Sequence, residues 1–316
     1  MKISFILRLM ILLPIFFLIG AESLFSQSNP DNSLCVSVKS AFPTSFTGAK
    51  PNVITDSSHC LPPFYDKLTA LRNPDNAEKP VVRIVQIGDS HVRSHEITPA
   101  FSMGLTENFG NAAVGVIEGY RSEGILQENG SPGVICHCIG INGATSHNFL
   151  DDKYLTQIQQ LKPDLIIISL GTNESVGSYD LYGHYEIMET LFSSLRNYCP
   201  DVPILYTTPP GAYRIIYGKY RRHRRIYRKV IAVRENTNTQ KVASTIKQFA
   251  VNHREAYWDL FNIAGGEKYA CRNWLKENYY QRDRIHFTGD GYALQGHLLY
   301  EALMKSYNNY VLNKHE

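Results

Sequence analysis

The sequence predicts an α/β protein, a three-layer α/β/α sandwich with a central parallel sheet. Two observations predict it. Short apolar runs rich in Val, Ile and Leu, typical of strands buried on both faces, alternate with longer segments in which apolar residues recur at helical spacing. The alternation runs from about residue 76 to the end of the 316-residue chain, and such alternation builds a parallel sheet wrapped by helices.

The expected strands are short apolar runs that stop at glycine, proline or polar residues. The clearest are VVRIVQI at 81–87 and LIIISL at 165–170, because β-branched residues suit a pleated surface covered on both faces. In chain order the expected strands are 81–87, 112–117, 134–140, 165–170, 203–208 and 256–261.

The expected helices lie between these strands and carry apolar residues three or four positions apart. Segment 184–198 shows this spacing and ends at Cys199-Pro200, where proline cannot continue a helix. In chain order the expected helices are 96–108, 154–161, 184–198, 242–250 and 292–307.

The start of the chain is typical of a secretory signal peptide. Within residues 1–27, two basic residues precede an apolar stretch over 10–20, and small and polar residues follow. The alternative is an uncleaved anchor, but the stretch is short for a membrane span and Pro14 interrupts it. We therefore expect a periplasmic or secreted protein with no stable membrane insertion after cleavage. The candidate cleavage positions follow Ser23, Ser26 or Gln27.

The mature chain divides into two parts. Residues 28–75 are rich in Pro, Ser, Asn and Asp, and we expect an irregular arm that packs on the rest of the protein. Residues 76–316 contain the whole alternating pattern and are expected to form one catalytic domain.

Six cysteines are an even set for an exported protein, where disulfides are common. Cys35 and Cys60 bracket the arm and are positioned to close it, although the spacing leaves the pairing open. Cys136 and Cys138 lie two apart on an expected strand, so they face the same way. With only His137 between them they make a poor metal site, and we expect neither a metal nor an organic cofactor.

The charge balance argues against a nucleic-acid partner, because the formal net charge is only +3. One segment is locally basic: YGKYRRHRRIYRK, residues 217–229, has seven Lys or Arg and three Tyr. We expect a solvated basic helix or loop. The alternative is a rim that attracts an anionic polymer, with tyrosine faces available to sugars.

Polar residues that carry chemistry follow several expected strands. In open α/β sheets, reactive groups collect at the carboxyl ends of strands. Three strands end in such a segment, and a fourth segment precedes the last helix. The four are GDSH at 88–91, INGAT at 141–145, GTNE at 171–174 and DRIH at 283–286.

Together these segments resemble the conserved blocks of the SGNH, or GDSL-like, hydrolase superfamily, in the family's order and over residues 81–306. The resemblance implies that family's flavodoxin-like sandwich and a serine hydrolase acting on carboxylic esters. The blocks are named for a Ser, a Gly, an Asn and a His. The matching positions are Ser90, Gly143, Asn173 and His286, with Asp283 three residues before the histidine.

The matched residues suit nucleophilic catalysis. A serine hydroxyl needs a base to take its proton as it attacks, and an imidazole performs this near neutral pH. A carboxylate holds the imidazole in one tautomer and stabilises its positive form. We therefore expect Ser90 as nucleophile, His286 as base and Asp283 as its orienting group. Asp259 and Asp290 are the rival carboxylates, but neither occupies the motif position.

A tetrahedral intermediate carries a negative oxygen that needs fixed hydrogen-bond donors. The resemblance implies three, the backbone N–H groups of Ser90 and Gly143 and the side-chain amide of Asn173. Gly143 is preferred to Gly140 because it lies in the loop beyond the strand. The remaining polar residues near these blocks are expected to brace loops or to lie at the surface or in packing, namely Asp89, Thr172, His91, His95, His147 and His184.

Segments such as IVQIGDSH and DRIHFTGDGYALQG are similar to those of secreted carbohydrate esterases, peptidoglycan O-acetylesterases among them. This implies removal of O-acetyl groups from an acetylated glycan substrate. Only 52 residues separate Ser90 from Gly143, so there is no room for the carbohydrate-binding module that some of these esterases insert there. The alternatives are a lipid esterase or lysophospholipase, an O-acetyltransferase, or a non-catalytic glycan-binding protein of the same fold.

Overall fold

The computed structural model describes residues 33–117, 124–222 and 225–314. Within them, six strands form the central sheet in the order β1-β10-β7-β6-β2-β5, and every pairing is parallel except that of β1. The strands are β1 Ile54–Thr55, β2 Val81–Gly88, β5 Gly133–Gly140, β6 Leu165–Ser169, β7 Ile204–Thr207 and β10 Ala256–Trp258.

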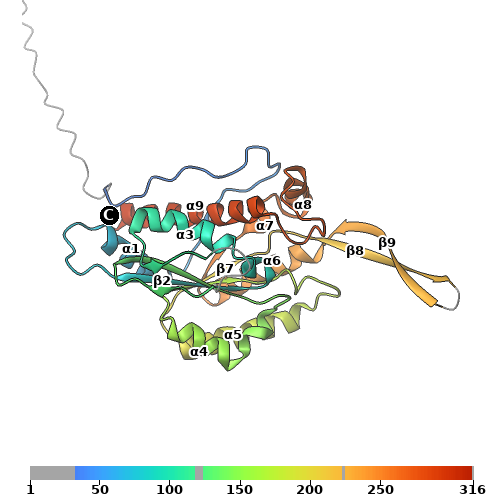
Figure 1. Cartoon of the computed structure of the whole chain (residues 1–316), viewed down its shortest axis with the longest axis horizontal. Coiled ribbons are helices and arrows are strands. Elements are labelled where there is room, and N and C mark those ends of the chain that lie inside the picture. Colours follow the sequence, from blue (N-terminus) through green and yellow to red (C-terminus); the bar gives the residue numbers. More distant parts are fainter. Residues whose placement is uncertain (1–32, 118–123, 223–224, 315–316) are drawn as a thin grey trace, which may run out of the picture.

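Helices cover both faces of this sheet, so the predicted three-layer sandwich is confirmed (Figure 1). The helices on one face are α1 Pro62–Arg72, α3 Ile97–Phe109 and α9 Gly289–Asn313. Those on the other face are α4 Asp152–Gln160, α5 Leu181–Tyr198 and α6 Asn238–Asn252. Shorter helical segments are α2 Ser90–Arg93, η2 Ser146–Leu150, α7 Leu260–Ile263 and α8 Gly266–Lys276.

The strand β2 shows why its sequence is apolar on both sides. Val82 and Ile84 belong to the core beneath α3 and α9, whereas Val85 and Ile87 belong to the core beneath α4 and α5. All four side chains are fully buried. The uninterrupted apolar run therefore fills two separate cores, as expected for a central parallel strand.

The arm over residues 28–75 is not irregular throughout, and that expectation is corrected. Its described part contains α1 and the edge strand β1, which pairs antiparallel with β10. Leu61, Phe64 and Leu68 lie in the core shared with α9 and are almost completely buried. The sequence did not predict this helix because proline, serine and aspartate flank its apolar residues, although these recur three and four positions apart.

The strand expected over 112–117 shrinks to β3, Ala113–Val114, which lies outside the central sheet. It pairs antiparallel with β4, Gln127–Glu128. The remaining strand predictions agree with the sheet to within one or two residues except at 256–261, where β10 stops at Trp258 and Asp259 caps α7.

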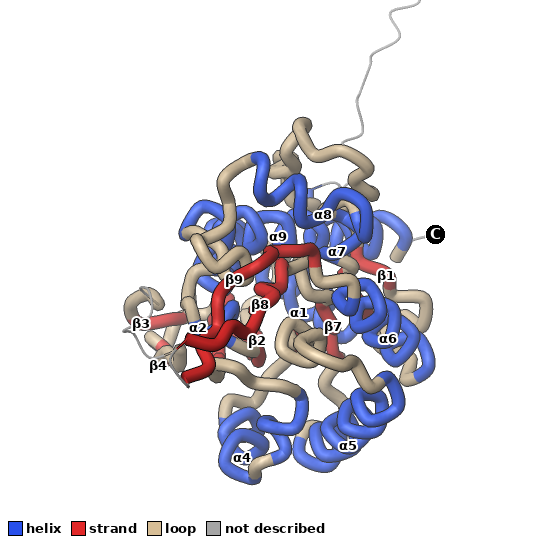
Figure 2. The backbone as a smooth tube through the Cα atoms, turned by 90° about the vertical axis from the view of Figure 1, so that its right-hand side faces the viewer, coloured by secondary structure: helices blue, strands red, loops and turns tan. Residues whose placement is uncertain are grey.

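The basic segment 217–229 is neither a helix nor a loop, and that expectation is also wrong. Its described residues, 217–222 and 225–229, belong to the antiparallel strands of a hairpin, β8, Tyr213–Arg222, and β9, Arg225–Glu235. Figure 1 shows the hairpin extending away from the sandwich, and in Figure 2 it lies in front of the body. Apolar and β-branched residues such as Ile215, Val230 and Val233 alternate with charged ones, which favours strands over helix.

Two further expectations concern the cysteines and the membrane. Cys60 carries a free thiol, so no bond from Cys35 closes the arm, and Cys136 and Cys138 are buried free thiols. No helix in the described ranges combines the length and apolar character that a bilayer span requires. The expected signal peptide, residues 1–27, lies outside the described residues.

Candidate active site

Ser90 lies where β2 ends at the edge of the sheet. Asp89 caps α2 by accepting a hydrogen bond from the His91 N–H at 2.8 Å, which fixes the turn that carries Ser90. At Gly88 a Cβ atom would lie 2.4 Å from Val92 Cγ2 and 2.5 Å from the Ser169 carbonyl oxygen. Only glycine fits there, so the strand turns sharply and presents Ser90 at the edge of the sheet.

Ser90, His286 and Asp283 form one hydrogen-bonded row. Ser90 Oγ lies 2.9 Å from His286 Nε2, and His286 Nδ1 lies 2.7 Å from Asp283 Oδ2. Asp283 Oδ1 accepts hydrogen bonds from the backbone N–H groups of Ile285 and His286, at 2.9 and 3.0 Å. The carboxylate is thus held by its own turn and aimed at the imidazole nitrogen that faces away from Ser90.

The row reaches solvent, because the side chains of His286 and Asp283 are 35% and 40% exposed. Burial alone raises the pKa of Asp283, but hydrogen bonds from His286 and from two backbone N–H groups outweigh it, so the pKa lies below its usual value of 3.8. Asp283 is therefore ionised at neutral pH and can stabilise a positive imidazole.

The loops after β5 and β6 meet beside this row. Asn173 Nδ2 donates to the Ala144 carbonyl oxygen at 3.0 Å and lies 3.4 Å from Asp89 Oδ2. Gly143 has a φ of +73° and open space where a Cβ would stand. Glu174 Oε1 accepts hydrogen bonds from the N–H and hydroxyl of Ser146, which ties the two loops together. Asn173 is thereby held beside the residue that precedes Ser90.

Two buried carboxyl groups support these loops. Burial raises the pKa of Asp89 from 3.8 to about 7, although hydrogen bonding and the nearby His286 oppose the rise. Burial likewise raises the pKa of Glu174 from 4.5 to about 7. Asp89, which is 1% exposed, braces the loops as expected through its contacts with His91 and Asn173.

The other candidate residues take structural positions. Asp259 bonds with Thr208, Lys247 and Asn262, and the outward nitrogen of His286 is already bonded to Asp283. Asp290 lies in the first turn of α9. Gly140 is a tight strand end, since a Cβ there would lie 2.2 Å from the Arg93 nitrogen. Of the remaining histidines, His147 is exposed, whereas His91, His95 and His184 are buried.

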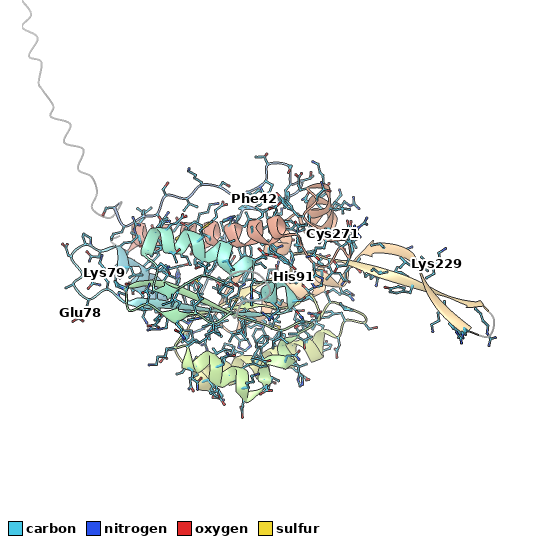
Figure 3. All side chains as sticks on the ribbon, viewed as in Figure 1. Phe42, Glu78, Lys79, His91, Lys229 and Cys271 are labelled. Atoms are coloured by element: carbon cyan, nitrogen blue, oxygen red, sulfur yellow. The ribbon has the colours of Figure 1, made fainter. Side chains whose placement is uncertain are left out.

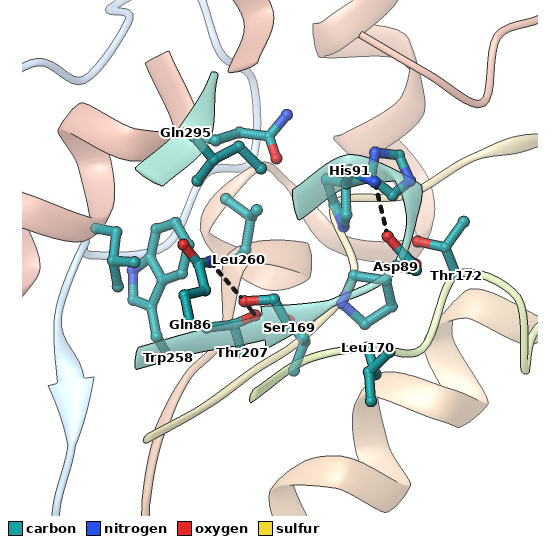
Figure 4. Close-up of a pocket in the computed structure, with 15 residues that line it drawn as sticks. Gln86, Asp89, His91, Ser169, Leu170, Thr172, Thr207, Trp258, Leu260 and Gln295 are labelled. Carbon is teal, nitrogen blue, oxygen red and sulfur yellow. Dashed lines mark hydrogen bonds between the residues drawn. The ribbon is translucent and has the colours of Figure 1, made fainter. Parts of the chain in front are cut away.

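His91 is closer to the row than the sequence indicated. Its ring centroid lies 5.5 Å from that of His286, and its Nδ1 lies 3.1 Å from the Tyr292 hydroxyl. Its Nε2 is buried with no hydrogen-bond partner in the described part of the chain. Figure 4 shows His91 and Asp89 at a small cavity of about 30 Å³, which Gln86, Ser169 and Thr207 also line. No sequence motif pointed to this contact.

A cleft of about 760 Å³ opens next to the row. Thr172, which precedes Asn173, and Ile285, which precedes His286, line it on one side. The base of the β8–β9 hairpin lines the other side, with Tyr213, Arg214 and Lys219 among its residues. The described cleft is thus bounded by the loops that carry the candidate residues and by the basic hairpin.

Comparison with known sequences accords with this geometry. The sequence profile of the GDSL-like lipase/acylhydrolase family matches residues 105–294, more than half of the chain. The chain belongs to this family. As a GDSL-like acylhydrolase it is a serine hydrolase of carboxylic esters, as the sequence predicted. The matched region holds Gly143, Asn173, Asp283 and His286, while Ser90 precedes it. A search among curated proteins found no match.

Two solved structures are similar to this GDSL-like acylhydrolase to different degrees. A peptidoglycan O-acetylesterase is 17% identical, with a TM-score of 0.67, and the match covers 81% of this chain and 99% of that one. A psychrotrophic esterase from Pseudoalteromonas sp. is 13% identical, with a TM-score of 0.45, and the match covers 72% of this chain and 99% of that one. At these identities the first likeness shows the α/β/α fold.

Proposed function

We propose that this chain is a serine esterase that removes O-acetyl groups from a glycan, with Ser90, His286 and Asp283 as its catalytic residues. The observation that carries the proposal is the row in which Ser90 Oγ lies 2.9 Å from His286 Nε2 and His286 Nδ1 lies 2.7 Å from Asp283 Oδ2. These are hydrogen-bond distances at which a base can take the hydroxyl proton.

In the proposed reaction, Ser90 Oγ attacks the acetyl carbonyl carbon while its proton passes to His286 Nε2. The C–O bond to the sugar then breaks, and His286 returns the proton to the sugar oxygen, leaving an acetyl group on Ser90. Water next attacks that carbonyl and gives a proton to His286. Acetate leaves, and Ser90 regains its proton. Asp283 stays ionised throughout and stabilises the imidazolium.

The negative oxygen of each tetrahedral intermediate needs donors already in place. The proposal assigns the backbone N–H groups of Ser90 and Gly143 and the side-chain amide of Asn173. The bond from Asn173 to Ala144 and the open surroundings of Gly143 support this assignment. Loss of one such donor costs roughly 3 kcal/mol of barrier, a hundredfold or more in rate.

An acetylated glycan is the favoured substrate for two reasons. A peptidoglycan O-acetylesterase has the same fold over 81% of this chain. The cleft beside the row is lined by Tyr213, Tyr217, Arg214 and Lys219, side chains that suit sugar faces and anionic groups. A glycan of the bacterial cell wall lies outside the cytoplasm, so the proposal includes action in the periplasm or outside the cell.

The test measures acetate released by purified protein from acetylated peptidoglycan and acetylated xylan, and fatty acid released from a lysolipid. Ser90→Ala protein, prepared in the same way, supplies the background. We expect acetate release from at least one glycan, none above background from the variant, and little fatty acid. Faster release of fatty acid than of acetate would show a lipid esterase instead. Transfer of acetyl to an added sugar in place of free acetate would show a transferase.

A further inference from the structure

The β8–β9 hairpin, residues 213–235, carries an unusual excess of positive charge. Its sequence has nine Lys or Arg and a single acidic residue, Glu235. That carboxylate already contacts Arg272 of α8 at 3.1 Å. The described cationic side chains are exposed along both strands, namely Arg214, Lys219, Arg221, Arg225, Lys229 and Arg234. Figure 3 shows the hairpin, with Lys229 labelled, standing away from the body.

The register places like charges opposite one another. Arg214 of β8 pairs with Arg234 of β9, and both side chains are exposed. Like charges at directly opposed positions destabilise an antiparallel pair, and a projecting two-stranded hairpin has little stability to spare. A bound anion would relieve this repulsion, so the charge pattern favours a negatively charged ligand over bare solvent.

Apolar and aromatic side chains are interspersed among the cations. Tyr217 pairs with Val230, and their side chains are 52% and 47% exposed. Lys219 and Arg221 follow on the same face as Tyr217, because every second residue of a strand points the same way. A carboxylate-bearing sugar polymer presents both apolar ring faces and anionic groups, and this mixed face suits both.

The hairpin is continuous with the cleft beside the candidate active site. Arg214, Tyr217 and Lys219 of β8 line the cleft of about 760 Å³ together with Ile285, the neighbour of His286. A chain with one sugar at Ser90 therefore has a lined path onto the hairpin. This continuity favours a substrate polymer over a separate partner.

We propose that the β8–β9 hairpin is a binding arm for a carboxylate-bearing glycan chain. It holds the sugars that flank the acetylated one, and cationic side chains pair with the carboxylates while Tyr217 and Val230 contact ring faces. The inference rests on the proposed function, because it takes the glycan at the hairpin and the glycan at Ser90 to be one chain. The enzyme is then selective for acidic over neutral acetylated polymers.

An anionic membrane is the main competing ligand for a basic hairpin. Exposed Ile226, Ile231 and Val233 would serve such a role if they formed a separate apolar face. In the register, Ile226 lies opposite Arg221 and Val233 lies opposite Ile215, so both belong to the face that also carries Lys219 and Arg221. Charged and apolar side chains are thus mixed on one face, which favours the glycan over a membrane.

The test uses the full chain with Ser90→Ala, so that binding is measured without turnover. The probes are polygalacturonate, its fully methyl-esterified form, which lacks the carboxylate charge, and phosphatidylglycerol vesicles. The hairpin variant combines R214Q, K219Q, R221Q and K229Q. Its matched control removes four exposed lysines of the body, K39Q, K79Q, K241Q and K276Q. Figure 3 shows that Lys79 lies at the end of the molecule opposite the hairpin.

We expect the parent to bind polygalacturonate far better than its methyl ester, with affinity that falls as salt rises. Each exposed ion pair contributes modestly to affinity. Removing four together should therefore lower the affinity for polygalacturonate roughly ten- to hundredfold in the hairpin variant, with little change in the control. A charge-retaining variant, R214K with R221K, should keep most of the affinity. That result would separate lost charge from a misfolded hairpin.

Equal polygalacturonate affinity in the hairpin variant and the control would overturn the inference. Hairpin-dependent binding of vesicles without binding of polygalacturonate would also overturn it, in favour of a membrane. Because acetate release is not the readout, a protein that binds the acidic polymer through the hairpin but releases no acetate would refute only the proposed function.

Discussion

Replacing Asp89 with asparagine should change how stability depends on pH. Asp89 lies directly before Ser90, is 1% exposed, and accepts a hydrogen bond from the His91 N–H. Asparagine has the same shape and keeps an oxygen for that bond, so Asp89→Asn chiefly removes a titratable group. The contact with Asn173 at 3.4 Å is at the weak end of hydrogen bonding and adds little.

The burial of Asp89 sets the size of this effect on stability. The pKa of Asp89 rises from 3.8 to about 7 on folding, because burial disfavours the charged carboxylate. The folded state therefore holds a proton that the unfolded state has released. The contribution to stability is complete below pH 3.8 and is lost as the pH rises to about 7. A shift of this size corresponds to about 4 kcal/mol.

Urea unfolding at pH 5 and pH 8 provides the assay, with parent, Asp89→Asn and the exposed control Asp152→Asn measured together. The parent should lose stability from pH 5 to pH 8, because its folded state gives up the proton on Asp89. Over that range the free energy of unfolding of Asp89→Asn should therefore rise by about 2–4 kcal/mol relative to that of the parent. The control should track the parent. Glu174, whose pKa also rises to about 7, remains in both proteins; burial is the largest cause of that rise and the charge of Asp89 a lesser one, so most of its contribution cancels from the comparison. A parent-to-variant difference that stays constant within about 1 kcal/mol would refute the reasoning.

Three further predictions concern turnover of a small acetyl ester. Ser90→Ala and His286→Ala should each reduce kcat to near background, and the double variant should lose little more, because the two act as a unit; additive losses would argue against that. Asp283→Asn should lower kcat by about 10³–10⁴ by holding the wrong imidazole tautomer, and a loss below tenfold would exclude Asp283 as orienter. Asn173→Ala should lower kcat by about 10²–10³ with little change in KM, whereas an effect on KM alone would place Asn173 in substrate binding.

Local patterns predicted most of the sandwich. Strand 165–170 matches β6 closely because its residues are apolar without a break, and burial on both faces leaves such a sequence few other conformations. The closing helix was predicted from spacing alone, and α9 extends it at both ends. The structure of the arm was harder to predict. Leu61, Phe64 and Leu68 lie among turn-forming residues, and their packing in the core shared with α9 stabilises the helix.

The β8–β9 hairpin shows where the composition of a segment and its structure disagree. Arginine and lysine are good helix formers, so segment 217–229 favoured a helix or loop by composition. Pairing across β8 and β9 overrode that preference, because each strand supplies the partner for the other's backbone groups. The contact of His91 with His286 was equally invisible, since a buried histidine and an exposed one look alike in sequence.

By itself, the sequence predicted which residues are candidates for the chemistry and where each lies along its strand, because the candidate nucleophile, base and glycine turns are read from short local segments. Only the tertiary structure decided that Ser90 and His286, 196 positions apart, lie within hydrogen-bond distance. It also decided that the basic segment borders the same cleft. Such contacts depend on how the sheet packs its strands and loops in space, and no local periodicity encodes that arrangement.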